Sequence, residues 1–123
     1  MTEETALSPL SFPKEARLLV AEAFRRVMGR GQRRQGKGFL LCYLETADDQ
    51  ARLGLTVSRK VGKAVVRNRV KRVARECFRQ WRGRFRKGCD CVLVARPAVA
   101  RVSPEAMRQD LATLFAPLMK RSV

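Results

Sequence analysis

The order of apolar and polar residues predicts an α+β fold: a helix, two or three strands, a long helix, a strand and a last helix around one sheet. Two observations support this prediction. Three segments repeat apolar residues at intervals of three and four, and short runs of strand-forming residues lie between them. A chain of 123 residues holds one modest core. We assign residues 1–13 to an extended N-terminus and residues 14–120 to a single domain.

The first helix is expected over residues 14–28, where leucines and Phe24 recur on one face, and Gly29 and Gly31 should end it. The basic, glycine-bounded connection over residues 32–38 could hold a short edge strand. The first helix is therefore expected to lead directly into the strands of the sheet.

Two strands follow, over residues 39–44 and 52–58, joined by a polar turn. In the second strand, Leu53, Leu55 and Val57 alternate with small polar residues, so only one face is strongly apolar. The small, polar face fits an open groove or an ordinary half-exposed sheet. The alternation alone does not separate the two.

A long helix is expected over residues 64–86 and carries two stripes. The apolar stripe should face the core and comprises Val66, Val70, Val73, Cys77 and Trp81, widened by Ala74, Phe78 and Phe85. The polar stripe comprises Asn68, Arg72, Arg75, Arg79, Arg82 and Arg86. One side of the helix is thus suited to packing and another to an anionic partner.

The last two elements are a continuous apolar strand over residues 90–95, expected at the centre of the sheet, and a helix that starts at Ser103. Ser103 is a good N-cap and Pro104 suits the first helical position. Pro117 should kink or end this helix.

Charge is the outlying property of the composition. The chain has 27 Lys and Arg against 11 Asp and Glu, a net charge of +16, and no His. Residues 59–87 hold thirteen of the cations and one acid, so they carry +12 of that charge. Charge this concentrated indicates a polyanionic partner, either nucleic acid or an anionic membrane surface.

Several other classes of protein find little support in the sequence. No apolar run is long enough for a membrane-spanning helix, and the acidic N-terminus lacks the layout of a signal peptide. Cys42, Cys77, Cys89 and Cys91 have neither metal-ligand spacing nor histidine neighbours, so we expect small buried side chains in a reducing cytoplasm. Because no acid/base pair or phosphate-loop motif stands out, the chain by itself does not look like an enzyme.

The chain can instead hold phosphates. Arginine grips phosphate with two parallel hydrogen bonds, and Asn68 can both donate to and accept from a ribose or base edge. The long helix begins just after Gly62, so its first N–H groups lie beside Lys60 and Lys63. These features predict a surface that attracts polyanions, but they do not specify a particular RNA.

Residues 52–76, RLGLTVSRKVGKAVVRNRVKRVARE, resemble the signature of the bacterial ribonuclease P protein component. The likeness extends upstream through FPKEARLL and FRRVMGRG and downstream through DCVLVARP, from about Phe12 to Leu118. The resemblance implies a two-layer α-β sandwich of order α-β-β-β-α-β-α with a left-handed β-α-β crossover, like a domain of a small-subunit ribosomal protein. It also makes residues 14–120 a ribonuclease P protein domain.

The resemblance also implies a function. Family members are bacterial, cytoplasmic subunits of an endoribonuclease whose catalytic RNA removes the 5′ leader from precursor tRNA. The partners would be that RNA, one protein per RNA, and precursor tRNA, with no membrane. The protein alone would bind no cofactor and hold no catalytic or metal-binding residue, since Mg²⁺ would serve the RNA active site.

Two sets of site residues follow from the resemblance. The set expected to bind the catalytic RNA is Lys60, Lys63, Arg67, Asn68, Arg69, Lys71, Arg72 and Arg75. The set expected to receive the single-stranded leader, in a cleft between the first helix and the sheet, is Phe24, Met28, Leu40, Cys42 and Arg59. Met28 replaces a common aromatic and Cys42 a common tyrosine, which should weaken base stacking.

Three alternatives remain. A ribosomal, rRNA-binding or RNA-chaperone protein could share this fold and charge. A DNA-binding helix would need a dimer seam, which the apolar stripe cannot supply if it packs on the sheet. A membrane-surface helix fits least, because globular patterns flank the basic segment on both sides.

Overall fold

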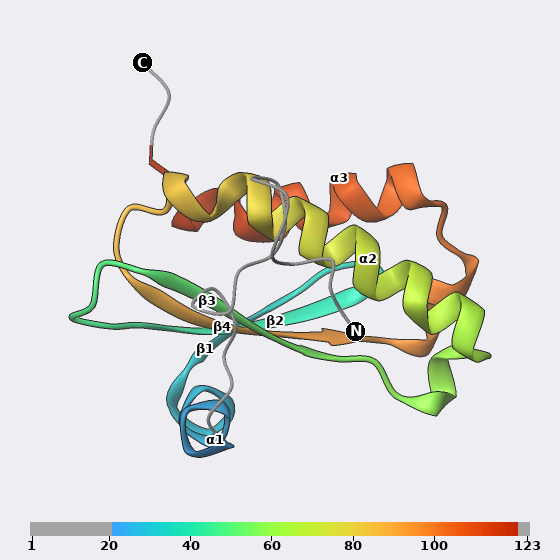
Figure 1. Ribbon diagram of the computed structural model, residues 1–123, viewed down its shortest axis with the longest axis horizontal. Helices are drawn as coiled ribbons and strands as arrows, with labels where there is room; N and C mark the ends of the chain where they lie inside the picture. The colour runs from blue at the N-terminus through green and yellow to red at the C-terminus, as the bar shows by residue number, and fades with distance from the viewer. Residues whose placement is uncertain (1–20, 121–123) are drawn as a thin grey trace, which may run out of the picture.

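The structure is a computed structural model and describes residues 21–120. Four strands form one sheet in the order β1-β2-β4-β3 (Figure 1). Along the chain, the elements are α1 (Ala21–Arg30), β1 (Gln32–Gln35), β2 (Phe39–Glu45), β3 (Ala51–Thr56), the 3₁₀ helix η2 (Arg59–Val61), α2 (Ala64–Trp81), η3 (Arg82–Arg84), β4 (Cys89–Ala95), η4 (Pro97–Arg101), α3 (Pro104–Phe115) and η5 (Ala116–Leu118). The predicted element order and the edge strand after α1 are confirmed.

The connection from β3 through α2 to β4 has an uncommon hand. β4 pairs with β3 in parallel and with β2 antiparallel, so it occupies the predicted central place. In Figure 1, β3 runs from left to right, α2 returns above the sheet, and β4 runs from left to right again behind β3. This is a left-handed crossover, whereas nearly all such connections are right-handed. It confirms the hand that the family resemblance implied.

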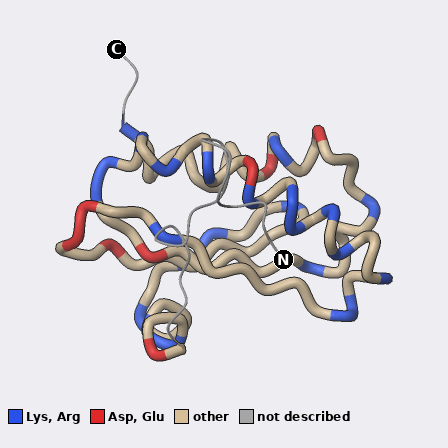
Figure 2. Tube along the Cα trace, viewed as in Figure 1, with Lys and Arg blue, Asp and Glu red and all other residues tan. Residues whose placement is uncertain are grey.

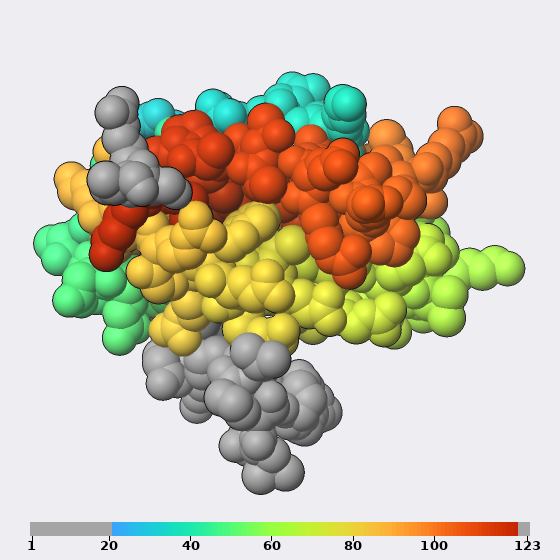
Figure 3. All heavy atoms as spheres, turned by 90° about the horizontal axis from the view of Figure 1, so that it is seen from above, coloured from blue at the N-terminus to red at the C-terminus, as the bar shows by residue number. Residues whose placement is uncertain are grey.

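The two faces of the sheet are covered by different helices. On one face, α2 and α3 lie side by side (Figure 3) and enclose the main core, which includes Leu41, Leu93, Phe78 and Leu111. On the other face, α1 packs against β2 and β4 through a small cluster of Val27, Cys42 and Val92. Because side chains alternate along a strand, adjacent residues such as Leu41 and Cys42 belong to different clusters.

Gly31 and Gly88 allow two close backbone approaches that shape the sheet. A Cβ on Gly31 would meet the carbonyl oxygens of Val27 and Tyr43 at 2.5 and 2.6 Å, so glycine lets α1 end directly against β2. A Cβ on Gly88 would collide with the backbone of Asp48, where the turn between β2 and β3 meets the start of β4. Both positions therefore require glycine for steric reasons.

The predicted end of the long helix is wrong. The α-helix ends at Trp81 rather than at residue 86, and the chain tightens into η3 before Phe85 takes an extended conformation. Phe85 is only 7% exposed and packs edge-on to Phe78 with ring centroids 5.6 Å apart. An unbroken helix would carry Phe85 past this aromatic cluster, and Gly83 weakens helix continuation. The break therefore lets Phe85 pack into the core.

Helix α1 runs to Arg30, two residues beyond its predicted end, and the part predicted over residues 14–20 lies outside the described residues. The predicted extended segment 1–13 lies outside them as well. The four cysteines are free and buried, as expected, and the sulfurs of Cys89 and Cys91 lie 3.7 Å apart on one face of β4. No helix in the described part of the chain is both long and apolar enough to cross a bilayer.

Candidate nucleic-acid interface

The turn between β3 and α2 is held in one conformation by local contacts. The hydroxyl oxygen of Ser58 accepts a hydrogen bond from the Lys60 N–H at 3.3 Å, and Val61 is buried beneath the turn. Gly62 has φ 150° and ψ −163°, a region that is accessible essentially to glycine alone. The flanking cations, Arg59, Lys60 and Lys63, are exposed on this fixed turn.

The first turn of α2 keeps its backbone donors uncapped. Lys63 occupies the N-cap position, where no side chain accepts a hydrogen bond from the helix N–H groups. The Nε of Arg67 donates instead to the Gly62 carbonyl oxygen at 3.1 Å, which fastens the helix to the turn. The positive end of the helix dipole therefore faces outward among cations.

The predicted RNA-binding residues gather on η2 and the first three turns of α2 (Figure 2). Asn68, Arg72 and Arg75 are exposed, whereas Arg67, Arg69 and Lys71 are half-buried. Arg69 also has a buried Nε with no hydrogen-bond partner. Within the described residues, none of these cations forms a salt bridge with an acid, so this half of the helix is a concentrated positive surface.

The C-terminal part of the polar stripe is less available to a binding partner. Arg79 and Arg82 are half-buried, and Arg86 forms a salt bridge of 3.7 Å with Glu45. Glu76, the single acid on α2, is directed to α3, where it pairs with Arg108 at 3.8 Å. By spacing alone, the polar stripe would be uniform. In the structure, its N-terminal half is unpaired, whereas its last member, Arg86, is paired with Glu45.

The predicted leader-binding residues are only partly brought together. Phe24 and Met28 of α1 and Leu40 of β2 are half-buried around one cluster, and Cys42 lies at its centre, fully buried. Burial raises the pKa of the Cys42 thiol, although Arg33 acts in the opposite direction. Arg59 belongs to η2, whose main contacts are with η4 and α2. The apolar cluster and Arg59 are therefore separate features of the fold.

Sequence reasoning missed Val65, the only large hydrophobic side chain that is exposed among residues 21–120, at 74%. It lies in the first turn of α2 beside the unpaired cations, where an apolar side chain could contact a sugar or base. Its position one residue outside the apolar stripe was the available signal. No three His, Cys, Asp or Glu side chains of the described residues are grouped so that they could hold a metal ion.

Comparison with known proteins decides the family. A family model described as ribonuclease P matches residues 12–119, nearly the whole chain. The chain belongs to the ribonuclease P protein family. It is 41% identical over 102 residues to the ribonuclease P protein component of Desulfotalea psychrophila, covering 83% of this chain and 85% of that one. It is 35% identical over 109 residues to that of Syntrophomonas wolfei, covering 89% and 88%.

Solved structures of the ribonuclease P family share the fold. The RNase P protein of Staphylococcus aureus is similar with a TM-score of 0.78 and 25% identity, over 85% of this chain and 98% of that chain. The RNase P protein of Thermotoga maritima, solved in complex with 1-(4-fluorophenyl)-2-thiourea, gives 0.74 and 33% identity, over 86% and 100%. The family resemblance inferred from residues 52–76 is therefore confirmed over most of the molecule.

Proposed function

We propose that this chain is the protein subunit of a bacterial ribonuclease P and binds the catalytic RNA of that enzyme. The observation that carries the proposal is the unpaired positive surface of η2 and the first half of α2, in a chain of the ribonuclease P protein family. Guanidinium groups and uncapped helix N–H groups on one rigid turn suit the phosphates of a folded RNA.

In this proposal the catalytic RNA contacts Lys60, Lys63, Arg67, Asn68, Arg69, Lys71, Arg72 and Arg75. The five exposed members, Lys60, Lys63, Asn68, Arg72 and Arg75, supply direct contacts. Arg67 has a double role, because its Nε holds the Gly62 turn while its terminal nitrogens remain able to reach a phosphate. Each phosphate contact adds to the salt dependence of binding, since counterions leave the RNA.

The 5′ leader of precursor tRNA is proposed to lie against the apolar cluster between α1 and the sheet. Phe24, Met28 and Leu40 expose part of their side chains there, whereas Cys42 supports them from below without surface of its own. Phe24 is the only aromatic residue of this set, so base stacking would rest on it alone. Arg59 would meet the leader only beyond the cluster, near η2.

The chemistry of leader removal is assigned to the RNA, with Mg²⁺ held by the RNA rather than by this chain. The protein contributes by neutralising repulsion between two RNAs and by extending the contact with precursor tRNA, which favours it over mature tRNA. We further propose one protein per RNA and a bacterial cytoplasmic setting, which the free, buried cysteines suit.

Reconstitution tests the proposal directly. The chain is combined with a bacterial ribonuclease P RNA and precursor tRNA at a magnesium concentration too low for the RNA alone. We expect leader release only when the chain is present, and a large loss of this stimulation for the Arg72→Ala, Arg75→Ala double variant. A ribosomal or RNA-chaperone protein would instead anneal unrelated RNAs without stimulating leader release, and that result would refute the proposal.

A further inference from the structure

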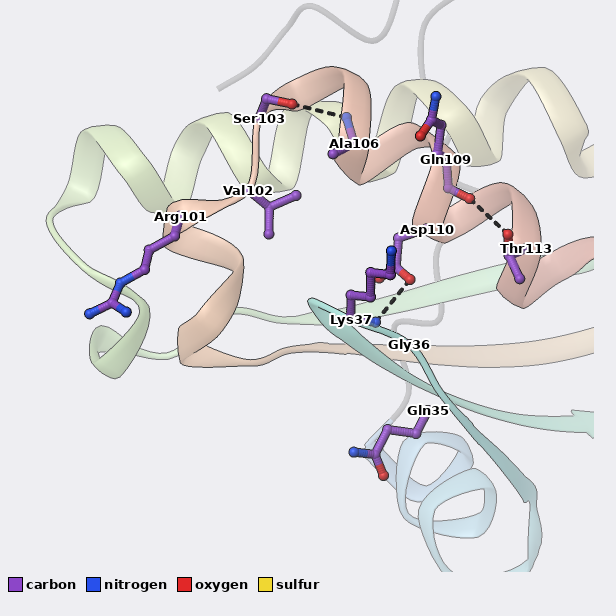
Figure 4. Close-up of a pocket in the computed structure, with 10 residues that line it drawn as sticks. All are labelled: Gln35, Gly36, Lys37, Arg101, Val102, Ser103, Ala106, Gln109, Asp110 and Thr113. Atoms are coloured by element: carbon purple, nitrogen blue, oxygen red, sulfur yellow. Dashed lines mark hydrogen bonds between the residues drawn. The ribbon is translucent and has the colours of Figure 1, made fainter.

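A groove of about 1030 Å³ lies between the β1–β2 turn and α3 (Figure 4), and none of its lining residues belongs to the two predicted sets of RNA-binding residues. The turn contributes Gly36 and Lys37, and the chain leaving η4 contributes Arg101 and Val102. The first three turns of α3 close the remaining side, with Ala106 near Val102. The groove thus joins segments that are about seventy residues apart in the sequence.

The walls of the groove are fixed by direct contacts. The carboxylate of Asp110 accepts hydrogen bonds from the N–H groups of Lys37 and Gly38, both at 2.9 Å. A Cβ on Gly36 would lie 2.5 Å from a carboxylate oxygen of Asp110, so glycine permits the close approach. Arg34 donates to the carbonyl oxygens of Leu114 and Thr113 in α3. The hairpin is thereby clamped to α3, and the groove is preorganised.

The groove is positively charged where it meets solvent. Asp110 is the single acid in its lining, and both of its oxygens are already occupied by backbone N–H groups. Lys37 and Arg101 are exposed and form no salt bridge within residues 21–120. Two free cations at the rim and the apolar side chains of Val102 and Ala106 within suit a strand that carries phosphates outside and bases inside.

The groove is also continuous with the surface proposed to bind the catalytic RNA. η4 packs against η2 and α2, so Arg101 at the end of η4 lies next to the segment that carries Lys60 and Lys63. Figure 4 shows Arg101 extending away from the groove on the side of this segment, whereas Lys37 rises within the groove beside Asp110. Cations therefore form a path from the α2 end into the groove.

We infer that this groove binds a single-stranded RNA segment that continues past the first turn of α2, with phosphates at Arg101 and Lys37. The inference rests on the proposed function and extends it with a second RNA contact on the same side of the sheet. It assigns roles to two cations outside the predicted set, Lys37 and Arg101. The occupant is RNA rather than a protein because the cations of the groove continue the positive surface proposed for the catalytic RNA.

Binding measurements test the two cations. Lys37→Ala and Arg101→Ala are compared with Lys120→Ala, a lysine that is also exposed and follows η5 at the far end of α3. We expect each groove variant to bind the ribonuclease P RNA, in complex with precursor tRNA, about threefold to tenfold more weakly, with a salt slope shallower by about one. Equal losses for Lys120→Ala would show a net-charge effect and overturn the inference.

Site-directed crosslinking tests the location independently. Because the four native cysteines are buried, an introduced surface cysteine can carry a photocrosslinker selectively. Gln109→Cys places it at the groove, Val65→Cys at the α2 surface, and Lys120→Cys serves as the control. We expect Gln109→Cys to crosslink to a few defined nucleotides and Lys120→Cys to give none.

The two proposals fail differently in this experiment. Crosslinks from Val65→Cys without crosslinks from Gln109→Cys would show that RNA binds α2 but not the groove, which overturns the inference alone. No crosslink from either position, together with unchanged RNA affinity in Arg72→Ala, would overturn the proposed function and the groove with it.

Discussion

Arg67 donates its Nε to the carbonyl oxygen of Gly62 at 3.1 Å and thereby ties the first turn of α2 to the turn that precedes it. Gly62 adopts a backbone conformation reserved for glycine, and the Arg67 hydrogen bond helps to hold it. A residue predicted from sequence to contact RNA thus also shapes the surface that RNA would contact. This dual use is hidden in the sequence, where Arg67 resembles its basic neighbours.

Arg67→Lys keeps the charge but removes the Nε donor. We expect the free protein to lose about 1 kcal/mol of stability, because the Gly62 carbonyl loses a partly buried partner. The amides of Lys60 and Val61 should exchange faster with solvent. Urea unfolding and amide hydrogen exchange measure both effects. Arg75→Lys, an exposed change on the same helix, is the control, and equal behaviour of the two variants would contradict the structural role.

Arg72→Ala should weaken binding of the ribonuclease P RNA and lower the salt slope by about one, because one phosphate contact and its released counterion are lost. By its spacing, Arg86 belongs to the same polar stripe, but it already pairs with Glu45. We therefore expect a smaller loss for Arg86→Ala. Filter binding over a salt series compares them, and identical slopes for both variants and the parent would exclude a docking role for Arg72.

Phe24→Leu keeps an apolar side chain against Val27 and Cys42 but removes the aromatic ring. We expect a loss of about 1–3 kcal/mol in the preference for precursor over mature tRNA, because one base stack disappears. Affinity for the catalytic RNA should not change. Competition binding with the two tRNAs measures the preference. Glu22→Ala, at an exposed position of α1, is the control; equal weakening of both tRNAs by Phe24→Leu would contradict a leader site.

Gly88→Ala should destabilise the fold by about 1–3 kcal/mol or more, because the new Cβ collides with the Asp48 backbone, which cannot move without displacing the β2–β3 turn. Gly83→Ala introduces the same methyl group where nothing lies within 4 Å, so its effect should stay within about 0.5 kcal/mol. Thermal unfolding of the two variants measures this difference in stability. Similar melting temperatures would show that the Gly88 contact is not restrictive.

The buried thiols predict a pH dependence. Burial raises the pKa of Cys42, Cys77 and Cys91 above the ordinary value of 9.0. Well below pH 9.0 these thiols are protonated in both states, so their contribution to stability is complete. Above it the unfolded chain ionises first, and stability falls until pH reaches the raised values. Urea unfolding across this range should show the decline, and replacing the three cysteines by alanine should flatten it.

Hydrophobic periodicity predicted those parts of the fold in which the burial of apolar side chains decides the structure. Val70, Val73 and Cys77 are buried as the helical stripe requires, and β4 is central because it is apolar on both faces. At the ends of the same stripe, Val66 and Trp81 are only half-buried. The early end of α2 could not be derived from spacing, because it depends on where Phe85 must sit relative to Phe78 and Phe115.

The candidate site, too, could be predicted only where helical spacing decides the arrangement. The exposed cluster of Asn68, Arg72 and Arg75 follows from helical spacing alone, as does its separation from the core. The groove beside α3 could not be predicted, because it forms only where Asp110 holds the β1–β2 turn on α3, a contact between distant segments. The pairing of Arg86 with Glu45 is likewise a tertiary contact.

In the proposed function, the sheet would set the distance between the two RNAs. Because α2 packs on one face and α1 on the other, the surface proposed for the catalytic RNA and the cluster proposed for the leader are separated by the thickness of the sheet and its packed layers, each about 10 Å. That separation is set by backbone pairing in four strands and does not depend on flexible side chains. In the proposed function, the protein would therefore fix how far the leader of precursor tRNA lies from the catalytic RNA.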